Sequence, residues 1–219
     1  MSIETKNRTS LSCNWTLDYY INVFYIINDE YTKYCNKWIE KVVKKYNLRK
    51  TCVCDIYSKN NGIDKDFKEF MDCFIEGLAL LSITIAYKIN NFNSELKIRS
   101  RVKDPQSILD KINKKSQGDK YPINKCLNDL FGLRIVDSNY KENIDNIIDY
   151  LECSEYNIRK MSRIKEDYKG YHIYFKQDKN IYFPIELQIW DSEDEFNNYE
   201  SHKVYKEDYV NWTDKYKEI

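Results

Sequence analysis

The sequence predicts an α+β fold in which helices flank a mixed β-sheet of about four to five strands. Apolar residues recur at helical spacing in the first half of the chain and with a period of two in the second half. At 42% hydrophobic and 32% charged residues, the composition is typical of a soluble globular protein. The length of 219 residues fits one domain, or one domain with an appendage.

The first half is predicted to be helical. Residues 16–48 carry apolar side chains between charged ones at near-helical spacing, and residues 65–98 form a second helical stretch. Residues 51–64 are irregular, with a turn signal at Asn60-Asn61-Gly62. The apolar run at 78–87 has about half the ~20 residues of a membrane crossing, so we expect a buried helix and no membrane association. We expect residues 1–95 to form an N-terminal helical extension packed on a core unit, residues 96–219.

The second half is predicted to contain the sheet. After a break at Asp104-Pro105, a short helix is expected over 107–115, because proline suits a first helical turn. Strands are expected at 130–136, 156–164, 171–176 and 181–190, and further helices at 142–151 and 192–209. In the last strand Glu186 alternates with apolar neighbours, so we expect its side chain to point away from the apolar face.

The cysteines and the N-terminus favour a cytoplasmic location. The seven cysteines are scattered without a regular framework, which is typical of a reducing compartment. The first ten residues have no apolar core, so a secretory signal is not expected. Cys52 and Cys54 form a close pair with no histidine nearby in sequence, and a structural zinc site is therefore not predicted.

Four short clusters contain side chains suited to chemistry on phosphates. Cations precede and line a helix start at 99–111, where free N–H groups and positive charge can hold a polyphosphate. Residues 128–136 place an aspartate just before an apolar strand, and residues 167–172 combine tyrosines with cations. Residues 184–190 and 201–206 add a strand glutamate and further polar groups. Taken singly, each cluster has an ordinary structural explanation, such as a solvated face.

In their order and spacing these clusters resemble the synthetase domain of the RelA/SpoT family, the small alarmone synthetases in particular. The likeness rests on RVKDPQSILDKI, NDLFGLRIV, the loop with tyrosine and histidine, IELQIW and HKVYK, between residues 97 and 206. It implies a nucleotidyltransferase-like synthetase fold with ATP as donor and Mg²⁺ as cofactor. It also implies transfer of the β,γ-pyrophosphate of ATP to the 3′-hydroxyl of a guanine nucleotide, GDP or GTP, giving (p)ppGpp. No metal-binding pattern of an alarmone hydrolase is evident, so synthesis only is expected.

The resemblance also implies roles for individual residues. Asp129 would bind Mg²⁺, and Glu186 would help to hold the metal or act as base on the attacking hydroxyl. The predicted ATP-binding residues are Arg101 and Arg134, on either side of the adenine, and Lys103, Ser107 and Lys111 at the triphosphate. The predicted acceptor-side residues are Tyr168, His172, Gln188, His202 and Lys206.

One geometric question arises from the spacing of Asp129 and Arg134. They are five residues apart, and strict alternation would send them to opposite faces of one strand. Either Asp129 precedes the strand, or Gly132 marks a bulge.

The acceptor has more than one interpretation. Asp167 stands where the family loop commonly has glycine, and a toxic branch of these synthetases instead modifies the 3′ CCA end of tRNA and is neutralised by an antitoxin. Basic residues outside the ATP site would suit RNA, although solvated faces or GTP phosphates explain them equally well. These candidates are Lys41, Lys44, Lys45, Arg159, Lys160, Arg163 and Lys165. A catalytically silent nucleotide sensor is a third possibility, and we expect a monomer or an assembly unlike the housekeeping tetramer.

Overall fold

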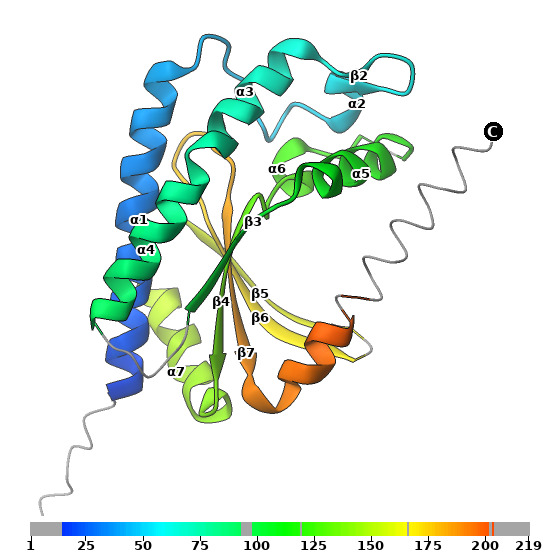
Figure 1. Ribbon diagram of the computed structural model, residues 1–219. Helices are drawn as coiled ribbons and strands as arrows, with labels where there is room; N and C mark the ends of the chain where they lie inside the picture. The colour runs from blue at the N-terminus through cyan, green and yellow to red at the C-terminus, as the bar shows by residue number, and fades with distance from the viewer. Residues whose placement is uncertain (1–14, 93–97, 119, 166, 202, 204–219) are drawn as a thin grey trace, which may run out of the picture.

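A five-stranded sheet with helices on both sides forms the body of the molecule (Figure 1). The computed structural model describes residues 15–92, 98–118, 120–165, 167–201 and 203. A two-stranded hairpin lies apart from the main sheet. The predicted α+β class with a mixed sheet is confirmed.

The order of the strands places the amino ends of two of them side by side. The strands are β3 (Ile98–Val102), β4 (Phe131–Asp137), β5 (Ile158–Lys165), β6 (Tyr168–Phe175) and β7 (Ile185–Asp191), arranged as β3-β4-β7-β6-β5. β4 and β7 are parallel, whereas the other neighbours are antiparallel. Polar residues near the start of β4 and of β7 therefore meet at one end of the sheet.

The two faces of β7 differ as its sequence predicts. Ile185, Leu187 and Ile189 join the hydrophobic core, and Glu186 and Gln188 lie on the opposite face with their polar partners. Glu186 is nevertheless only 4% exposed. It is a buried carboxylate, not an ordinary exposed strand residue.

The apolar face of the sheet is covered mainly by α1 (Trp15–Lys41) and α7 (Tyr140–Cys153). Phe24 of α1 lies 6.3 Å from Phe175 of β6 and 6.2 Å from Tyr150 of α7, between ring centroids. Tyr31 of α1 donates a hydrogen bond to the carbonyl of Phe183, just before β7. The amphipathic pattern thus forms a core helix, which ends at residue 41 and not at 48 as predicted.

The second helical stretch is divided in two by Gly77. α3 (Lys65–Glu76) precedes it and α4 (Leu78–Phe92) follows it. A Cβ at Gly77 would lie 2.6 Å from the Tyr34 ring of α1, so glycine permits this close packing. By length and composition alone residues 65–92 could span a membrane, but a core helix passes the same test and 33% of the apolar window is buried.

The prediction of helix up to residue 98 was wrong at its end, because Ile98 begins β3. This strand pairs only with β4 in the sheet order and exposes its central Arg-Ser-Arg residues. An edge strand with an exposed, charged centre lacks the apolar alternation that identifies strands in a sequence. The irregular segment 51–64 likewise contains α2 (Val53–Ile56) and a hairpin of β1 (Tyr57–Ser58) and β2 (Gly62–Ile63). Gly62 there has a φ of 70°.

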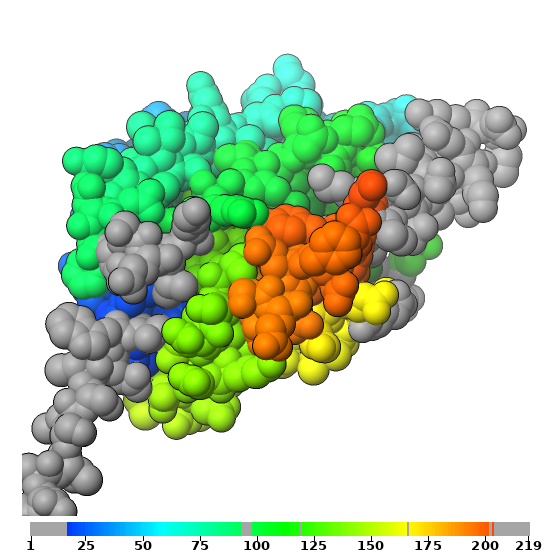
Figure 2. All heavy atoms as spheres, turned by 60° about the horizontal axis from the view of Figure 1, so that its bottom comes forward, coloured from blue at the N-terminus to red at the C-terminus, as the bar shows by residue number. Residues whose placement is uncertain are grey.

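Two short helices and a C-terminal segment complete the polar side of the molecule. α5 (Pro105–Ser116) begins after Asp104, whose Oδ1 accepts from the Ser107 amide at 3.0 Å, and α6 (Ile123–Cys126) precedes β4. Residues 192–194 form the short helix η1 and residues 195–201 continue helically. Figure 2 shows this orange segment against the green of β3 and the yellow-green of α7, and an Arg99–Glu195 ion pair of 3.5 Å joins it to β3. The rest of the predicted final helix, beyond residue 203, lies outside the described residues.

The apolar residues of the N-terminal helices and of the sheet belong to one hydrophobic core. Backbone bonds also join the two parts, from Ile123 N to Thr51 O at 3.0 Å and from Leu48 N to Asn180 O at 2.6 Å. A division into residues 1–95 and 96–219 stays a prediction.

Candidate active site

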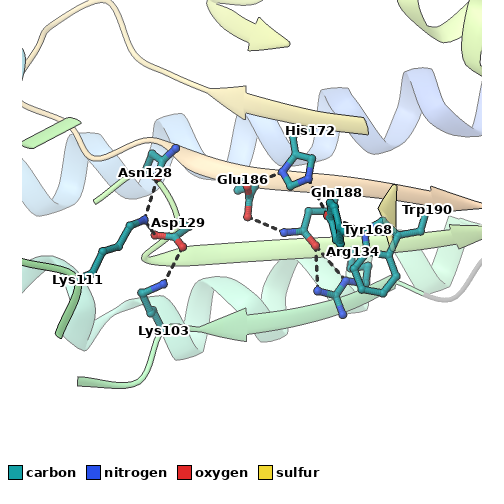
Figure 3. Close-up of polar contacts among 10 residues, drawn as sticks. All are labelled: Lys103, Lys111, Asn128, Asp129, Arg134, Tyr168, His172, Glu186, Gln188 and Trp190. Carbon is teal, nitrogen blue, oxygen red and sulfur yellow. Dashed lines mark hydrogen bonds and ion pairs between the residues drawn. The ribbon is translucent and has the colours of Figure 1, made fainter. Parts of the chain in front are cut away.

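Asp129 lies in the loop before β4 and is held by two lysines (Figure 3). Its Oδ2 accepts from Lys103 Nζ at 2.7 Å, and its Oδ1 accepts from Lys111 Nζ at 2.9 Å. Lys103 stands just before α5 and Lys111 lies in it, so the helix start and the strand start share one carboxylate. Asp129 therefore precedes the strand, and Gly132 keeps regular pairing with Arg101 and Glu186 without a bulge.

The electrostatics of this triad keep Asp129 ionised. Burial alone would raise the pKa of Asp129, but the adjacent positive charges of Lys111 and Lys103 outweigh it, and the pKa is lowered. Burial lowers the pKa of Lys103. For Lys111, the attraction of Asp129 outweighs burial and raises the pKa. Two cations and one anion leave a net positive charge that suits a phosphate.

Glu186 is held from two sides by the side chains of His172 and Gln188. Its Oε1 lies 2.8 Å from Nδ1 of His172 on β6, and its Oε2 accepts from Nε2 of Gln188 at 2.8 Å. Burial acts to raise the pKa of Glu186, but the hydrogen bond and charge of His172 act against it, and the pKa is lowered overall. The carboxylate is therefore ionised at neutral pH and fixed in orientation.

The partners of Glu186 continue into a chain of hydrogen bonds. With Glu186 ionised, His172 Nδ1–H donates to it, and in the neutral imidazole Nε2 accepts from the Tyr168 hydroxyl at 2.7 Å. Trp190 Nε1 donates to the same hydroxyl at 3.1 Å. Tyr168 is 7% exposed, and its burial is the main reason why its pKa is raised to about 12. It is thus a buried phenol with its oxygen engaged.

Arg134 closes this chain into a ring of contacts (Figure 3). Its Nε and Nη2 donate to Gln188 Oε1 at 3.1 and 2.9 Å. Its guanidinium carbon lies 3.5 Å from the centroid of the Trp190 ring. Movement of any one member would disturb the support of Glu186.

Gly170 packs closely against two members of this ring of contacts, which leads to a testable prediction. A Cβ there would lie 2.9 Å from Trp190 Cδ1 and 3.0 Å from the Tyr168 hydroxyl. We expect Gly170→Ala to lower the free energy of unfolding by about 1–3 kcal/mol, because the buried indole must shift. Urea unfolding would measure this. Gly118→Ala is the matched control, because its Cβ would meet no described atom within 4 Å and should change stability by less than about 0.5 kcal/mol. Equal stability of Gly170→Ala and Gly118→Ala would show that the Trp190 indole does not have to shift.

A cleft of about 400 Å³ lies beside the ring. Arg101, Arg134, Glu186 and Gln188 line it, together with Arg99 of β3 and Tyr199 of the C-terminal segment. The two arginines that the resemblance places around an adenine therefore do lie at one cleft. Tyr199 packs edge-on against Trp190 with ring centroids 5.3 Å apart.

The donor set fits a magnesium ion carried by a phosphate substrate. Mg²⁺ is usually held by one or two carboxylates together with phosphate oxygens and waters. Asp129 and Glu186 are ionised carboxylates near the starts of neighbouring strands. The charge of Asp129 acts to raise the pKa of Glu186, and the charge of Glu186 acts to raise the pKa of Lys111. No cluster of three acidic, histidine or cysteine ligands occurs among the residues that the structure describes. The two carboxylates suit a Mg²⁺ ion whose remaining ligands are phosphate oxygens and waters.

Other predicted site residues are placed less centrally. Ser107 lies in the first turn of α5, one turn before Lys111. Lys44 pairs with Asp66, and Lys160 pairs with Glu152 of α7, on the side of the sheet away from Glu186. Lys41 and Lys45 are exposed and line neither this cleft nor the larger hollow described below. Arg163 and Lys165 are exposed on the edge strand β5, and Arg159 lines the larger hollow. His202 and Lys206 lie outside the described residues.

Sequence reasoning missed the supporting roles of Trp190, Tyr199 and Tyr174. Trp190 is four residues after Glu186, so strand alternation alone could have placed it on the same face. Tyr174 is two residues after His172 in a predicted strand, so alternation could have placed it on that face too. Tyr199 gave no such signal, since its contact depends on long-range packing.

Comparison with known proteins identifies the family. The sequence model described as "Region found in RelA / SpoT proteins" matches residues 100–209. No curated protein matches. Similar solved structures include small alarmone synthetase 1 from Bacillus subtilis bound to its product pppGpp, at 20% identity over 64% of this chain and 81% of that chain, with a TM-score of 0.43. Another structure of that protein gives 21% identity over 66% and 82%, with a TM-score of 0.43. Its complex with AMPCPP gives 18% identity over 66% and 81%, with a TM-score of 0.40.

At these scores the structural likeness is too distant to transfer the role of any residue. The family match is independent of it and covers β3 to the C-terminal segment, including both carboxylates and both arginines of the site. The chain therefore belongs to the RelA/SpoT family and carries its synthetase domain.

Proposed function

We propose that the protein is an ATP-dependent pyrophosphotransferase that moves the β,γ-pyrophosphate of ATP to the ribose 3′-hydroxyl of a guanine nucleotide. The observation that carries the proposal is one continuous site. Two ionised carboxylates near the starts of β4 and β7 adjoin two part-buried lysines and an arginine-lined cleft. This arrangement suits phosphoryl chemistry, in which positioning and charge compensation supply most of the catalysis.

Glu186 is the proposed base. The oxygen of the acceptor hydroxyl attacks the β-phosphorus while its proton passes to the Glu186 carboxylate, and the bond from the β-phosphorus to the α-phosphate oxygen breaks, which releases AMP. His172 and Gln188 keep the carboxylate aimed and ionised. A ribose hydroxyl is a poor nucleophile at neutral pH, so a fixed carboxylate within hydrogen-bond reach assists it.

Lys103 and Lys111 are the proposed phosphate ligands. Both are largely shielded from solvent and pair with the same carboxylate, so the two cations are already held close together when a triphosphate binds. Asp129, assisted by Glu186, would hold Mg²⁺. That ion supplies Lewis-acid stabilisation of the charge that develops on the phosphate oxygens.

Arg134 is the proposed adenine contact, together with Arg101. We expect Arg134→Ala to weaken binding of a non-hydrolysable ATP analogue roughly tenfold, because a cation–π contact and cleft shape are lost. Arg134→Lys should recover little of this, since the ammonium group cannot stack as a plane. Calorimetric titration without acceptor measures the effect. Unchanged affinity in both variants would remove Arg134 from the adenine site.

The tRNA 3′ end is the second candidate acceptor. It is favoured by the burial of Tyr168, whose phenol oxygen is engaged by His172 and Trp190 and whose ring would have to leave this network to stack on a guanine. The test is to supply ATP labelled at its γ-phosphate with GDP, GTP or deacylated tRNA. Label on GDP or GTP supports the proposal, and label on tRNA alone replaces it by the second candidate. Label on none of the three removes the enzymatic function.

A further inference from the structure

A second and larger hollow lies on the other side of the catalytic carboxylates from the arginine-lined cleft. Its volume is about 620 Å³. It is formed by the loop after α1, the segment around α6, and the neighbouring ends of β5, β6 and β7. Backbone bonds from Leu48 N to Asn180 O at 2.6 Å and from Asn124 N to Leu48 O at 2.9 Å join these segments. The hollow thus has a fixed backbone frame that includes the N-terminal part of the chain.

The hollow gathers positive charge without carboxylate partners. Its four cations are Arg49, Lys125, Arg159 and Lys176. None of them forms an ion pair within the part of the chain that the structure describes, and Asp178 is the single acidic residue among the described residues of the lining. Burial, followed by repulsion from Arg159 and Arg49, lowers the pKa of Lys176. Like charges held together in this way favour binding of an anion.

The hollow also contains side chains that can form hydrogen bonds with hydroxyls and with the edges of bases. Five side-chain amides line it, those of Asn124, Asn128, Asn157, Gln177 and Asn180. Asn124 Oδ1 is buried and has no hydrogen-bond partner in the described structure. A fully ionised phosphate can only accept hydrogen bonds from these amides, whereas a ribose hydroxyl or a base amino group can also donate to their oxygens. The lining therefore suits a ligand with both phosphate and hydrogen-bond donors, which describes a nucleotide.

Two lining residues connect the hollow to the catalytic groups. Tyr174 is in register with Glu186, and burial, followed by the charge of Glu186, raises the pKa of Tyr174. Asn128 immediately precedes Asp129 and lies 3.4 Å from Lys111 Nζ through its Oδ1. Glu186 itself lines the arginine-containing cleft. The two cavities thus approach the carboxylates from different sides.

We propose that this hollow binds a phosphate-bearing nucleotide unit of the acceptor, while ATP occupies the arginine-lined cleft. The identification of the ligand as the acceptor rests on the proposed function. A free guanine nucleotide and the 3′ end of an RNA share the required chemistry. In either case Tyr174 and Asn128 mark the side from which the 3′-hydroxyl reaches Glu186.

Equilibrium binding to the full chain without ATP tests this proposal independently of catalysis. The probes are fluorescent GDP and a short fluorescent RNA that ends in CCA. Arg159→Glu and Arg49→Glu should each weaken the probe that the wild type binds by at least about tenfold, since an anion then faces a reversed charge. Arg159→Lys should retain most of the affinity. Lys37→Glu is the matched control, because this exposed α1 residue lines neither cavity and has no ion pair among the described residues.

The probe that binds identifies the source of the nucleotide. Wild-type affinity in both charge-reversal variants, or an equal loss in Lys37→Glu, would overturn the proposal, as would failure of the wild type to bind either probe. Binding of an ATP analogue should stay unchanged in all variants, which shows that they are folded. If the probes bind as expected but no label is transferred in the acceptor assay, the nucleotide site stands and the proposed function fails.

Discussion

Replacement of Glu186 by glutamine should reduce pyrophosphate transfer by roughly a hundredfold to ten-thousandfold, the usual contribution of a positioned general base. Glutamine is nearly isosteric, so the contacts with His172 and Gln188 can be rearranged without a change in volume. The loss should appear in kcat at saturating ATP and acceptor, measured by release of AMP.

The control for this variant is Glu152→Gln, which alters an exposed carboxylate paired with Lys160 on the far side of the sheet. It should transfer pyrophosphate at the wild-type rate. Circular dichroism and unfolding midpoints would show that Glu186→Gln is folded. Substantial residual activity in a folded Glu186→Gln protein would exclude a role of this carboxylate as base.

Replacement of Asp129 by asparagine should reduce transfer by about a hundredfold to a thousandfold, the effect of losing one preorganised charge contact. It also leaves Lys103 and Lys111 buried beside each other without their common counterion. We therefore expect lower stability as well as lower activity, and a higher magnesium concentration for half-maximal rate. Asp72→Asn, an exposed carboxylate on α3, is the control for a lost charge.

The stability effect has a defined pH dependence. The pKa of Asp129 is lower in the folded chain than its ordinary value, so its stabilisation is complete above the pKa of the unfolded chain and is lost as pH falls through the folded pKa. The difference in unfolding free energy between wild type and Asp129→Asn should therefore be largest near neutral pH and shrink in acid. Urea titrations across this range measure it, and a constant difference would show that the lysines do not depend on this charge.

Local patterns in the sequence predicted the strand that carries Glu186 and the helix that carries Lys111. The alternation around Glu186 placed this residue on the face opposite Ile185 and Leu187, as the structure confirms. Asp104 and Pro105 gave the start of α5, because capping and proline geometry act within a few residues. Such signals depend only on neighbours along the chain.

Features that depend on strand order were not predictable in this way. β3 was missed because its centre is exposed and charged. The ring that links Glu186, His172 and Arg134 forms only because β6, β7 and β4 are adjacent in the sheet. The larger hollow unites Arg49, Arg159 and Lys176, which lie far apart in the sequence.

The sequence by itself determined the chemical groups available to this protein, the period of each element and the family resemblance. The tertiary structure alone decided that Glu186 is buried between His172 and Gln188, that one aspartate pairs with two lysines, and that a second cationic hollow adjoins the site. The physical reason is the distance along the chain between the residues that interact. Periodicity and capping are set by contacts within a turn or two of the chain, whereas burial and charge compensation are set by the register of strands that meet only when the sheet assembles.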